Sequence, residues 1–178
     1  MIEVLWHGRG GQGAFTAAKL LGAAYSLSNL RNYALSFPSF GAERRGAPIL
    51  AFTKLDTKKI SDRSQIRKAD YVVFLDDTLF TDESINEVKD NGKIFINSKK
   101  KFDDVRIISF DADSLALSIL KMPVTNTVML SILVKYSGLV SEGSLKESIR
   151  LYMNPKLYEK NSLIIDEVFK AVEIKHEF

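Results

Sequence analysis

Residues 7–14 read HGRGGQGA and follow directly on the apolar run of residues 2–6, IEVLW. An apolar run of this length that stops at glycine predicts a buried strand. The small and apolar residues of 15–27 (FTAAKLLGAAYSL) recur at helical spacing, so a helix is predicted there. Between the two segments the pattern G-x-G-x-x-G is satisfied by Gly8, Gly10 and Gly13. A strand, a glycine loop and a helix in this order suit a phosphate or carboxylate, because the start of a helix offers unpaired N–H groups to an anion.

Two familiar nucleotide sites do not fit the rest of the pattern. A dinucleotide site has an acidic residue at the end of its second strand, whereas residues 33–41 (YALSFPSFG) contain no acid and the next is Glu43. A P-loop needs Lys and Ser/Thr after its last glycine, and Ala14 and Phe15 stand there. The loop is therefore not expected to bind NAD or ATP in the usual manner.

A tight turn without any ligand remains the structural alternative for the glycine loop. Arg9 and Gln12 favour a ligand, because a turn by itself has no need of a guanidinium. Arginine carries a permanent charge and forked N–H donors that match phosphate or carboxylate oxygens. The sequence thus predicts an anion site, and the turn-only alternative stays open.

Composition places the chain among ordinary globular proteins. It has 178 residues, of which 46% are hydrophobic and 26% charged, so residues 1–178 are expected to form a single domain. No apolar run reaches the roughly 18 residues of a membrane span, and the N-terminus does not resemble a signal peptide. We expect a cytoplasmic protein with no membrane contact. The chain has no cysteine, which excludes disulfides, thiolate catalysis and a cysteine-ligated iron–sulfur cluster within it, and its two histidines show no metal-ligand spacing.

The charge is unevenly distributed along the chain, although the net charge is only +3. Residues 43–68 hold eight Lys/Arg against three acids, and residues 70–87 hold six acids and no base. One interpretation is two solvated faces; the other is a basic surface that meets an anionic ligand or an acidic partner. Nucleic acid is not expected, because no helix-turn-helix, zinc-finger or RNP-like pattern accompanies the basic stretch.

Alternating strand and helix signals predict an α/β fold. Strands are predicted at residues 2–6, 32–37, 49–55, 69–75, 93–97 and 105–110. Helices are predicted at residues 15–27, 80–91, 111–120, 125–136, 144–153 and 155–172. The expected architecture is a mainly parallel, Rossmann-like sheet with helices on both faces and a helical C-terminal third.

A second unusual stretch, residues 37–48 (FPSFGAERRGAP), combines two prolines, two glycines, two aromatic residues and Glu-Arg-Arg. The loops that follow parallel strands leave the same carboxyl edge of a sheet, where ligands bind in open α/β folds. Both arginine-bearing loops are therefore expected to line one crevice. The alternative is an irregular surface loop solvated by Glu43, Arg44 and Arg45.

The two stretches together, HGRGGQGA-x-TAA and FPSFGAERRGAP, resemble the gamma subunits of 2-oxoacid:ferredoxin oxidoreductases, most closely those of the pyruvate (pyruvate synthase) type. The similarity continues through PVTNTVML at residues 123–130 and Pro155-Lys-Leu, and it covers essentially the whole chain. Phe15 is a small departure, since valine is commoner at that position.

The resemblance implies a division of labour among subunits. Enzymes of this family oxidatively decarboxylate a 2-oxoacid with coenzyme A, giving acyl-CoA, carbon dioxide and reduced ferredoxin. Thiamine diphosphate and magnesium are expected between the alpha and beta subunits, and [4Fe-4S] clusters on the beta and delta subunits. The gamma subunit is expected to help form the coenzyme A side of the active-site cavity, with no catalytic residue, metal or independent activity of its own. The 2-oxoacid is expected to be pyruvate; branched-chain 2-oxoacids, 2-oxoglutarate and indolepyruvate stay open.

The same resemblance implies the ligand-facing residues. The backbone cradle and its neighbouring wall, or subunit contact, would comprise Gly8, Arg9, Gly10, Gly11, Gln12, Gly13, Phe37, Pro38, Gly41, Glu43, Arg44, Arg45, Gly46 and Asn126. For Glu43 the alternative is an internal ion pair with the two arginines after it. Asn126 is interpreted either as a helix cap or as a contact to the glycine loop. A stand-alone module that binds coenzyme A or a nucleotide, and a purely structural scaffold of the same complex, are the alternative functions.

Overall fold

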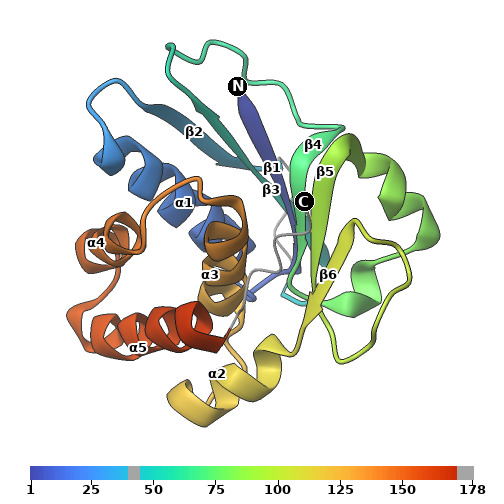
Figure 1. Cartoon of the computed structure of the whole chain (residues 1–178), viewed down its shortest axis with the longest axis vertical. Helices are drawn as coiled ribbons and strands as arrows, with labels where there is room; N and C mark the ends of the chain where they lie inside the picture. Colours follow the sequence, from blue (N-terminus) through green and yellow to red (C-terminus); the bar gives the residue numbers. More distant parts are fainter. Residues whose placement is uncertain (40–44, 172–178) are drawn as a thin grey trace.

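The computed structural model describes residues 1–39 and 45–171, which form one six-stranded sheet and five α-helices (Figure 1). The strand order is β2-β3-β1-β4-β5-β6. The strands are β1 (Ile2–Arg9), β2 (Tyr33–Pro38), β3 (Pro48–Asp56), β4 (Ala69–Phe74), β5 (Val88–Asn97) and β6 (Ile107–Phe110).

The sheet is mainly parallel, as the sequence predicts. β1, β4, β5 and β6 pair in parallel, and only β3 runs against its neighbours β1 and β2. The connection from β2 to β3 is only nine residues long, 39–47. A parallel crossover needs a dozen residues or more, so the chain can return only in the antiparallel direction.

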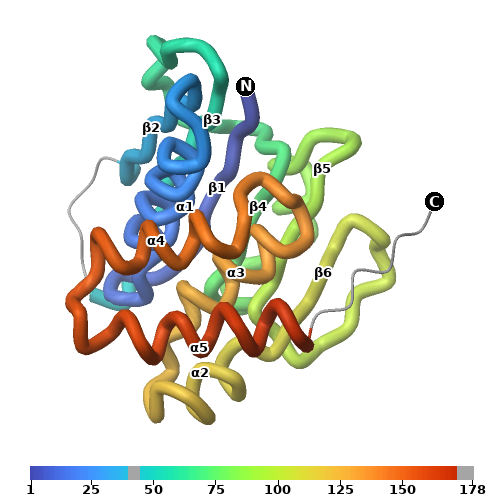
Figure 2. Tube along the Cα trace, turned by 60° about the vertical axis from the view of Figure 1, so that its left-hand side comes forward, coloured from blue at the N-terminus to red at the C-terminus, as the bar shows by residue number. Residues whose placement is uncertain are grey.

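The five α-helices lie on one face of the sheet (Figure 1). They are α1 (Ala14–Ser28), α2 (Ala112–Leu120), α3 (Asn126–Ser137), α4 (Glu142–Tyr152) and α5 (Pro155–Ala171). α1 and α3 contact the strands, and α4 and α5 pack on these two helices (Figure 2). Trp6 and Val4 of β1 are fully buried beneath them, in the core that this helical layer covers. None of the helices in the described part of the chain is long and apolar enough to cross a bilayer.

The opposite face is covered by two 3-10 helices, η1 (Asp77–Leu79) and η2 (Asp82–Glu87), and by connecting segments. They shield a second apolar layer that includes Leu5, Phe52 and Phe74. Both faces therefore carry helical segments, but the α-helix predicted at residues 80–91 is wrong. β5 already begins at Val88, which pairs with Ala69 of β4, so the end of the predicted segment is strand, and the residues before it form 3-10 turns instead of an α-helix.

The end of the sheet away from the glycine loop is held by an ion pair between a buried lysine and a half-exposed aspartate. Lys54 on β3 is fully buried, and its Nζ lies 2.6 Å from Asp62 Oδ2 in the segment that joins β3 to β4. The hydrogen bond from Lys54, helped by the hydroxyl and amide of Ser64, holds the pKa of Asp62 well below its usual range. A charged lysine is tolerated in the core here because a carboxylate accompanies it.

This ion pair makes stability depend on pH. Because the folded-state pKa of Asp62 is lowered, its contribution is present above the ordinary aspartate pKa of about 4 and is lost as the pH falls toward the folded-state value. Asp62→Asn should lower the urea midpoint at about pH 6, and the difference in midpoint between the variant and wild type should shrink as the pH falls below about 4. A gap that stays constant over this range, measured by circular dichroism, would rule out a titrating contribution from Asp62.

Candidate functional site

The glycine loop and the segment before β3 are joined at the carboxyl edge of the sheet. Gly10 N donates to Ala47 O at 2.8 Å, and Gly46 N donates back to Gly10 O at 3.0 Å. Arg45 continues this strip as a bridge partner of Gly10. These contacts confirm that the two predicted loops meet at one edge. Phe37 and Pro38 end β2 at the same edge, whereas Gly41, Glu43 and Arg44 lie outside the described residues.

The glycine loop is a tight turn that is closed by two hydrogen bonds between Gln12 and the backbone of Arg9. Gln12 Oε1 accepts from Arg9 N at 2.7 Å, and Gln12 N donates to Arg9 O at 2.9 Å. Gly11 and Gly13 adopt φ values of +96° and +80°, in the left-handed region where other residues are strained. Gly8 is buried, and a Cβ there would lie 3.1 Å from Ala14 Cβ. The glycines therefore set both the path of the turn and the close approach of α1 to the sheet.

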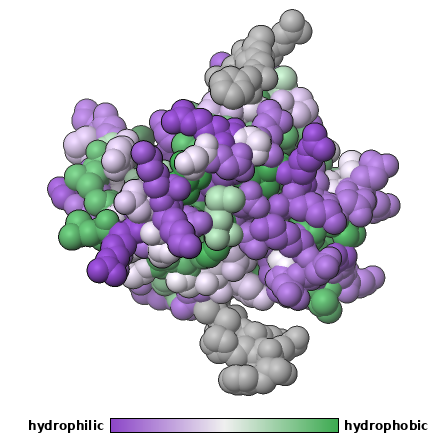
Figure 3. All heavy atoms as spheres, turned by 90° about the horizontal axis from the view of Figure 1, so that it is seen from above, coloured by the Kyte–Doolittle hydropathy of each residue, from purple (hydrophilic) through white to green (hydrophobic). Residues whose placement is uncertain are grey.

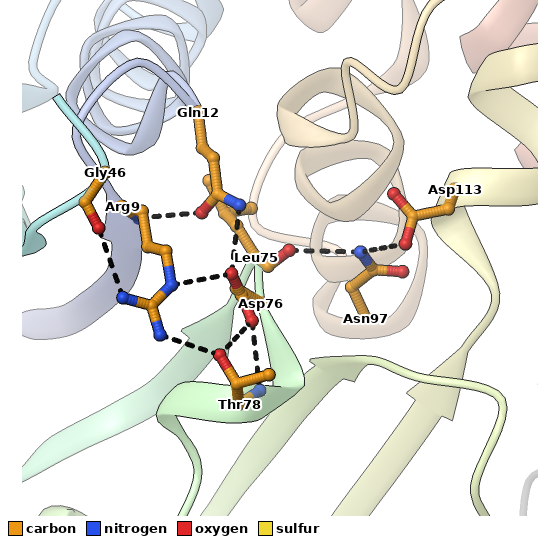
Figure 4. Close-up of polar contacts among 8 residues, drawn as sticks. All are labelled: Arg9, Gln12, Gly46, Leu75, Asp76, Thr78, Asn97 and Asp113. Atoms are coloured by element: carbon orange, nitrogen blue, oxygen red, sulfur yellow. Dashed lines mark hydrogen bonds and ion pairs between the residues drawn. The ribbon is translucent and has the colours of Figure 1, made fainter.

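Arg9 is partly exposed and is held against the protein by three hydrogen bonds (Figure 4). Its Nε donates to Asp76 Oδ2 at 3.0 Å, its Nη1 to Gly46 O at 3.1 Å and its Nη2 to Thr78 Oγ1 at 2.9 Å. Gln12 Nε2 also reaches Asp76 Oδ2, at 3.2 Å. We call Arg9, Gln12, Gly46, Asp76 and Thr78 the Arg9–Asp76 cluster. It links the glycine loop, the segment before β3 and the turn after β4.

Asp76 is the acceptor at the centre of this cluster. Burial alone would raise the pKa of Asp76, but hydrogen bonds from the hydroxyl and amide of Thr78 and from Gln12, together with the charge of Arg9, hold it below its usual value. The carboxylate is thus ionised at neutral pH and offsets the charge of Arg9. A guanidinium has two N–H groups on each Nη, and each Nη of Arg9 makes one bond within the described residues. Arg9 is therefore held in a fixed position, and two of its N–H groups make no hydrogen bond to any described residue.

The beginning of α3 lies against the beginning of α1. Asn126 is only 4% exposed, and its Nδ2 lies 3.4 Å from Gly13 O. The cap position of α3 is Thr125, so the interpretation of Asn126 as a helix cap is wrong and the contact to the glycine loop is correct. Neither helix has a capping side chain or an acid in its first turn. Two positive helix ends thus lie beside the glycine loop.

A second layer of polar contacts supports the turn after β4. Asn97, at the end of β5, donates to Leu75 O at 3.0 Å and to Asp113 Oδ2 at 3.2 Å (Figure 4). Its Oδ1 accepts from Ala112 N at 3.0 Å. Asn97 therefore connects β4, β5 and the start of α2 behind the Arg9–Asp76 cluster.

Sequence reasoning missed Asp76, Thr78 and Asn97. Asp76 follows a strongly β-branched strand, and its position at the carboxyl end of that strand is a signal from which it could have been found. The interpretation of the acidic segment 70–87 as a solvated face is wrong for three of its members. Asp70 pairs with Lys89, Asp76 with Arg9 and Glu87 with His7.

Within residues 1–39 and 45–171, no group of three or more potential metal-ligating side chains comes together. A cavity of about 400 Å³ lies beside α1 and β2, lined by residues such as Lys19, Ala23, Ser36 and Tyr152, and it includes no residue of the glycine loop. The described carboxyl edge of the sheet offers backbone and guanidinium N–H donors and a paired carboxylate. Donors of this kind suit an anionic ligand.

An α/β domain with a mainly parallel sheet and a glycine loop between its first strand and first helix is of the Rossmann-like class. The family model for pyruvate ferredoxin/flavodoxin oxidoreductase matches residues 3–171. The chain belongs to this family, which confirms the resemblance seen in its two motifs.

Relatives match along almost the whole chain. The chain is 40% identical over 184 residues to the "Pyruvate/ketoisovalerate oxidoreductases common subunit gamma" of Pyrococcus furiosus, covering 98% of each. It is 43% identical over 181 residues to pyruvate synthase subunit PorC of Methanocaldococcus jannaschii, covering 99% of this chain and 96% of that one. The crystal structure of the pyruvate oxidoreductase subunit PORC from Thermotoga maritima superposes with a TM-score of 0.81 at 30% identity and covers 95% of each chain. Each of these relatives is a subunit of a larger oxidoreductase.

Proposed function

We propose that this chain is the gamma subunit of a CoA-acylating 2-oxoacid:ferredoxin oxidoreductase, with pyruvate as the substrate of the complex. Its glycine-loop edge forms the coenzyme A side of the active-site cavity. The observation that carries the proposal is the junction of the two arginine-bearing loops at the carboxyl edge, with Arg9 fixed between them. Full-length similarity to gamma-type subunits supports the assembly part of the proposal.

The donors at this edge suit the phosphates of coenzyme A, which carries a pyrophosphate and a 3′-phosphate. The start of α1 provides backbone N–H groups with no side-chain cap and no acid in the first turn. Arg9 adds two N–H groups that are held in position and make no bond to any described residue, and Arg45 is an exposed cation on the adjoining strip. A fixed arginine loses little side-chain entropy on binding, so its hydrogen bonds to a phosphate are retained as affinity.

The redox and carbanion chemistry then belongs to partner subunits. The [4Fe-4S] clusters require other chains, since this one has no cysteine. The family resemblance assigns thiamine diphosphate and magnesium to partner subunits as well. The partners are alpha, beta and delta subunits, and ferredoxin receives the electrons through the complex. No residue of this chain is assigned a bond-making step, and the 2-oxoacid pocket lies on the other subunits.

Reconstitution of the complex tests the assignment as a subunit. Ferredoxin reduction by pyruvate plus coenzyme A should be absent with this chain alone. It should fall by at least about a hundredfold when the chain is omitted from the assembled enzyme. Full activity without the chain would overturn the proposal. Micromolar affinity of the isolated chain for coenzyme A, measured by calorimetry, would favour a stand-alone binding module instead.

The coenzyme A contact of Arg9 has its own test. In the assembled enzyme Arg9→Ala should raise the KM for coenzyme A about tenfold and leave kcat at saturating coenzyme A nearly unchanged, since one to two charge-assisted hydrogen bonds are lost. Arg31→Ala is the control, because Arg31 is exposed just beyond the other end of α1. An unchanged KM in an intact complex would assign the glycine loop a scaffold role.

A further inference from the structure

The segment between β3 and β4, residues 57–68, lies at the opposite end of the sheet from the glycine loop (Figure 1). The register places it there, because Leu55 of β3 pairs with Ile2 and Tyr71 of β4 pairs with Val4, both near the start of β1. We call this segment the basic loop. Its five cationic side chains are all exposed: Lys58, Lys59, Arg63, Arg67 and Lys68.

Acids close to the basic loop are engaged elsewhere. Asp62, the one acid inside it, lies 2.6 Å from the buried Lys54. Asp56 pairs with the N-terminal amino group at 3.3 Å, and Asp70 pairs with Lys89 at 2.8 Å. None of the five cations of the basic loop forms an ion pair with any residue in the described ranges. Viewed from this end of the molecule, hydrophilic side chains cover much of the face (Figure 3).

The basic loop is also fixed to the body of the protein. Ile66 is 6% exposed and packs in the apolar layer under η1 and η2. Asp62 ties the middle of the loop to β3 through Lys54, and it also accepts from Ser64 N at 2.9 Å. Asp56 accepts from Lys58 N at 3.1 Å and fixes the first turn. The cations therefore project from a segment that is fixed to the protein. Their mutual repulsion destabilises the folded state.

We propose that the basic loop is a docking surface for an acidic face of another protein chain. Resting on the proposed function, that chain is a partner subunit of the oxidoreductase. Uncompensated cations at fixed positions give electrostatic complementarity, which speeds association and fixes orientation. A nucleic-acid partner fits less well. Residues 57–68 contain no aromatic side chain on which a base can stack, and they form no helix that enters a groove.

Charge reversal at this loop tests the proposal in the full chain. The variant Lys58→Glu/Lys59→Glu/Arg63→Glu should bind the complex of the remaining subunits with an association rate constant at least about tenfold lower than wild type at about 50 mM NaCl. At about 500 mM NaCl the two rates should converge, because salt screens exposed charges. The control Lys101→Glu/Lys156→Glu/Lys160→Glu reverses three exposed lysines elsewhere and should stay within about twofold. Equal thermal midpoints show that both variants are folded.

The outcomes separate this inference from the proposed function. If wild type binds the other subunits and reversal has no effect beyond the control, the docking surface is refuted and the subunit assignment stands. If wild type does not bind them at all, the proposed function fails. If reversal instead abolishes binding to single-stranded DNA or to phosphatidylserine vesicles and leaves subunit association unchanged, the loop serves a nucleic acid or a membrane, and the protein-docking inference is overturned.

Discussion

Replacing Gly13 with alanine should lower the free energy of unfolding by about 3 kcal/mol, because two penalties add at this position. Gly13 has φ +80°, in the left-handed region. An added Cβ would also lie 2.5 Å from Asn126 Nδ2, and Asn126 is only 4% exposed, so it has little room to move. Urea denaturation followed by circular dichroism measures the loss.

Gly11, in the same loop, allows the cost of backbone strain to be measured separately from the cost of the steric clash. Gly11 has φ +96°, but a Cβ there would meet nothing within 4 Å, so Gly11→Ala should cost only the backbone strain of about 1 to 2 kcal/mol. Removing the obstructing side chain with Asn126→Ala should bring the cost of Gly13→Ala down to that of Gly11→Ala. Equal costs for the two glycine variants in the wild-type background would show that Asn126 does not restrict this turn.

Replacing Asp76 with alanine should have the second largest effect. It leaves Arg9 Nε, Gln12 Nε2 and the amide and hydroxyl of Thr78 without their shared acceptor. We expect a loss of about 2 kcal/mol in the free energy of unfolding, in the lower range for a charged network because the Asp76 side chain keeps some solvent access. Because Arg9 is released, the KM for coenzyme A of the assembled enzyme should also rise about tenfold.

A double variant tests whether Asp76 acts on coenzyme A through Arg9. If it does, Arg9→Ala/Asp76→Ala should raise the KM for coenzyme A no further than either single change. Asp82→Ala is the matched control, since Asp82 is an exposed acid of the same segment in the first turn of η2. Additive effects of Arg9→Ala and Asp76→Ala on this KM would contradict a positioning role for Asp76.

The local parts of the fold were predictable. The strand that ends at the glycine loop, the helix after it and the helix after Pro123-Val-Thr all follow from hydrophobic period and from glycine or proline at a boundary. Such signals depend only on residues close together in the chain, so they can be recognised from the sequence alone. The meeting of the two loops was also predictable, because β1 and β2 run in the same direction and therefore end at the same edge.

The helix predicted at residues 80–91 shows where this reasoning ends. Its composition permits a helix, but Val88 is already part of β5 and pairs with Ala69. A Cβ at Gly92 would lie 2.5 Å from Asp70 O, so glycine is required where the strand passes close to β4. The end of this segment is a strand because it pairs with β4, almost twenty residues earlier in the chain. Local sequence patterns do not predict pairing between segments so far apart.

By itself, the sequence determined that this protein has a glycine loop between a strand and a helix, an arginine within that loop and no thiol for cluster or covalent chemistry. These are properties of neighbouring residues and of composition. Only the tertiary structure decided what Arg9 does with its donors. Its carboxylate partner, Asp76, is 67 residues away in the chain and is brought to it by the parallel pairing of β1 with β4. Electrostatic partners are chosen by distance in space, which the order of residues along the chain does not record.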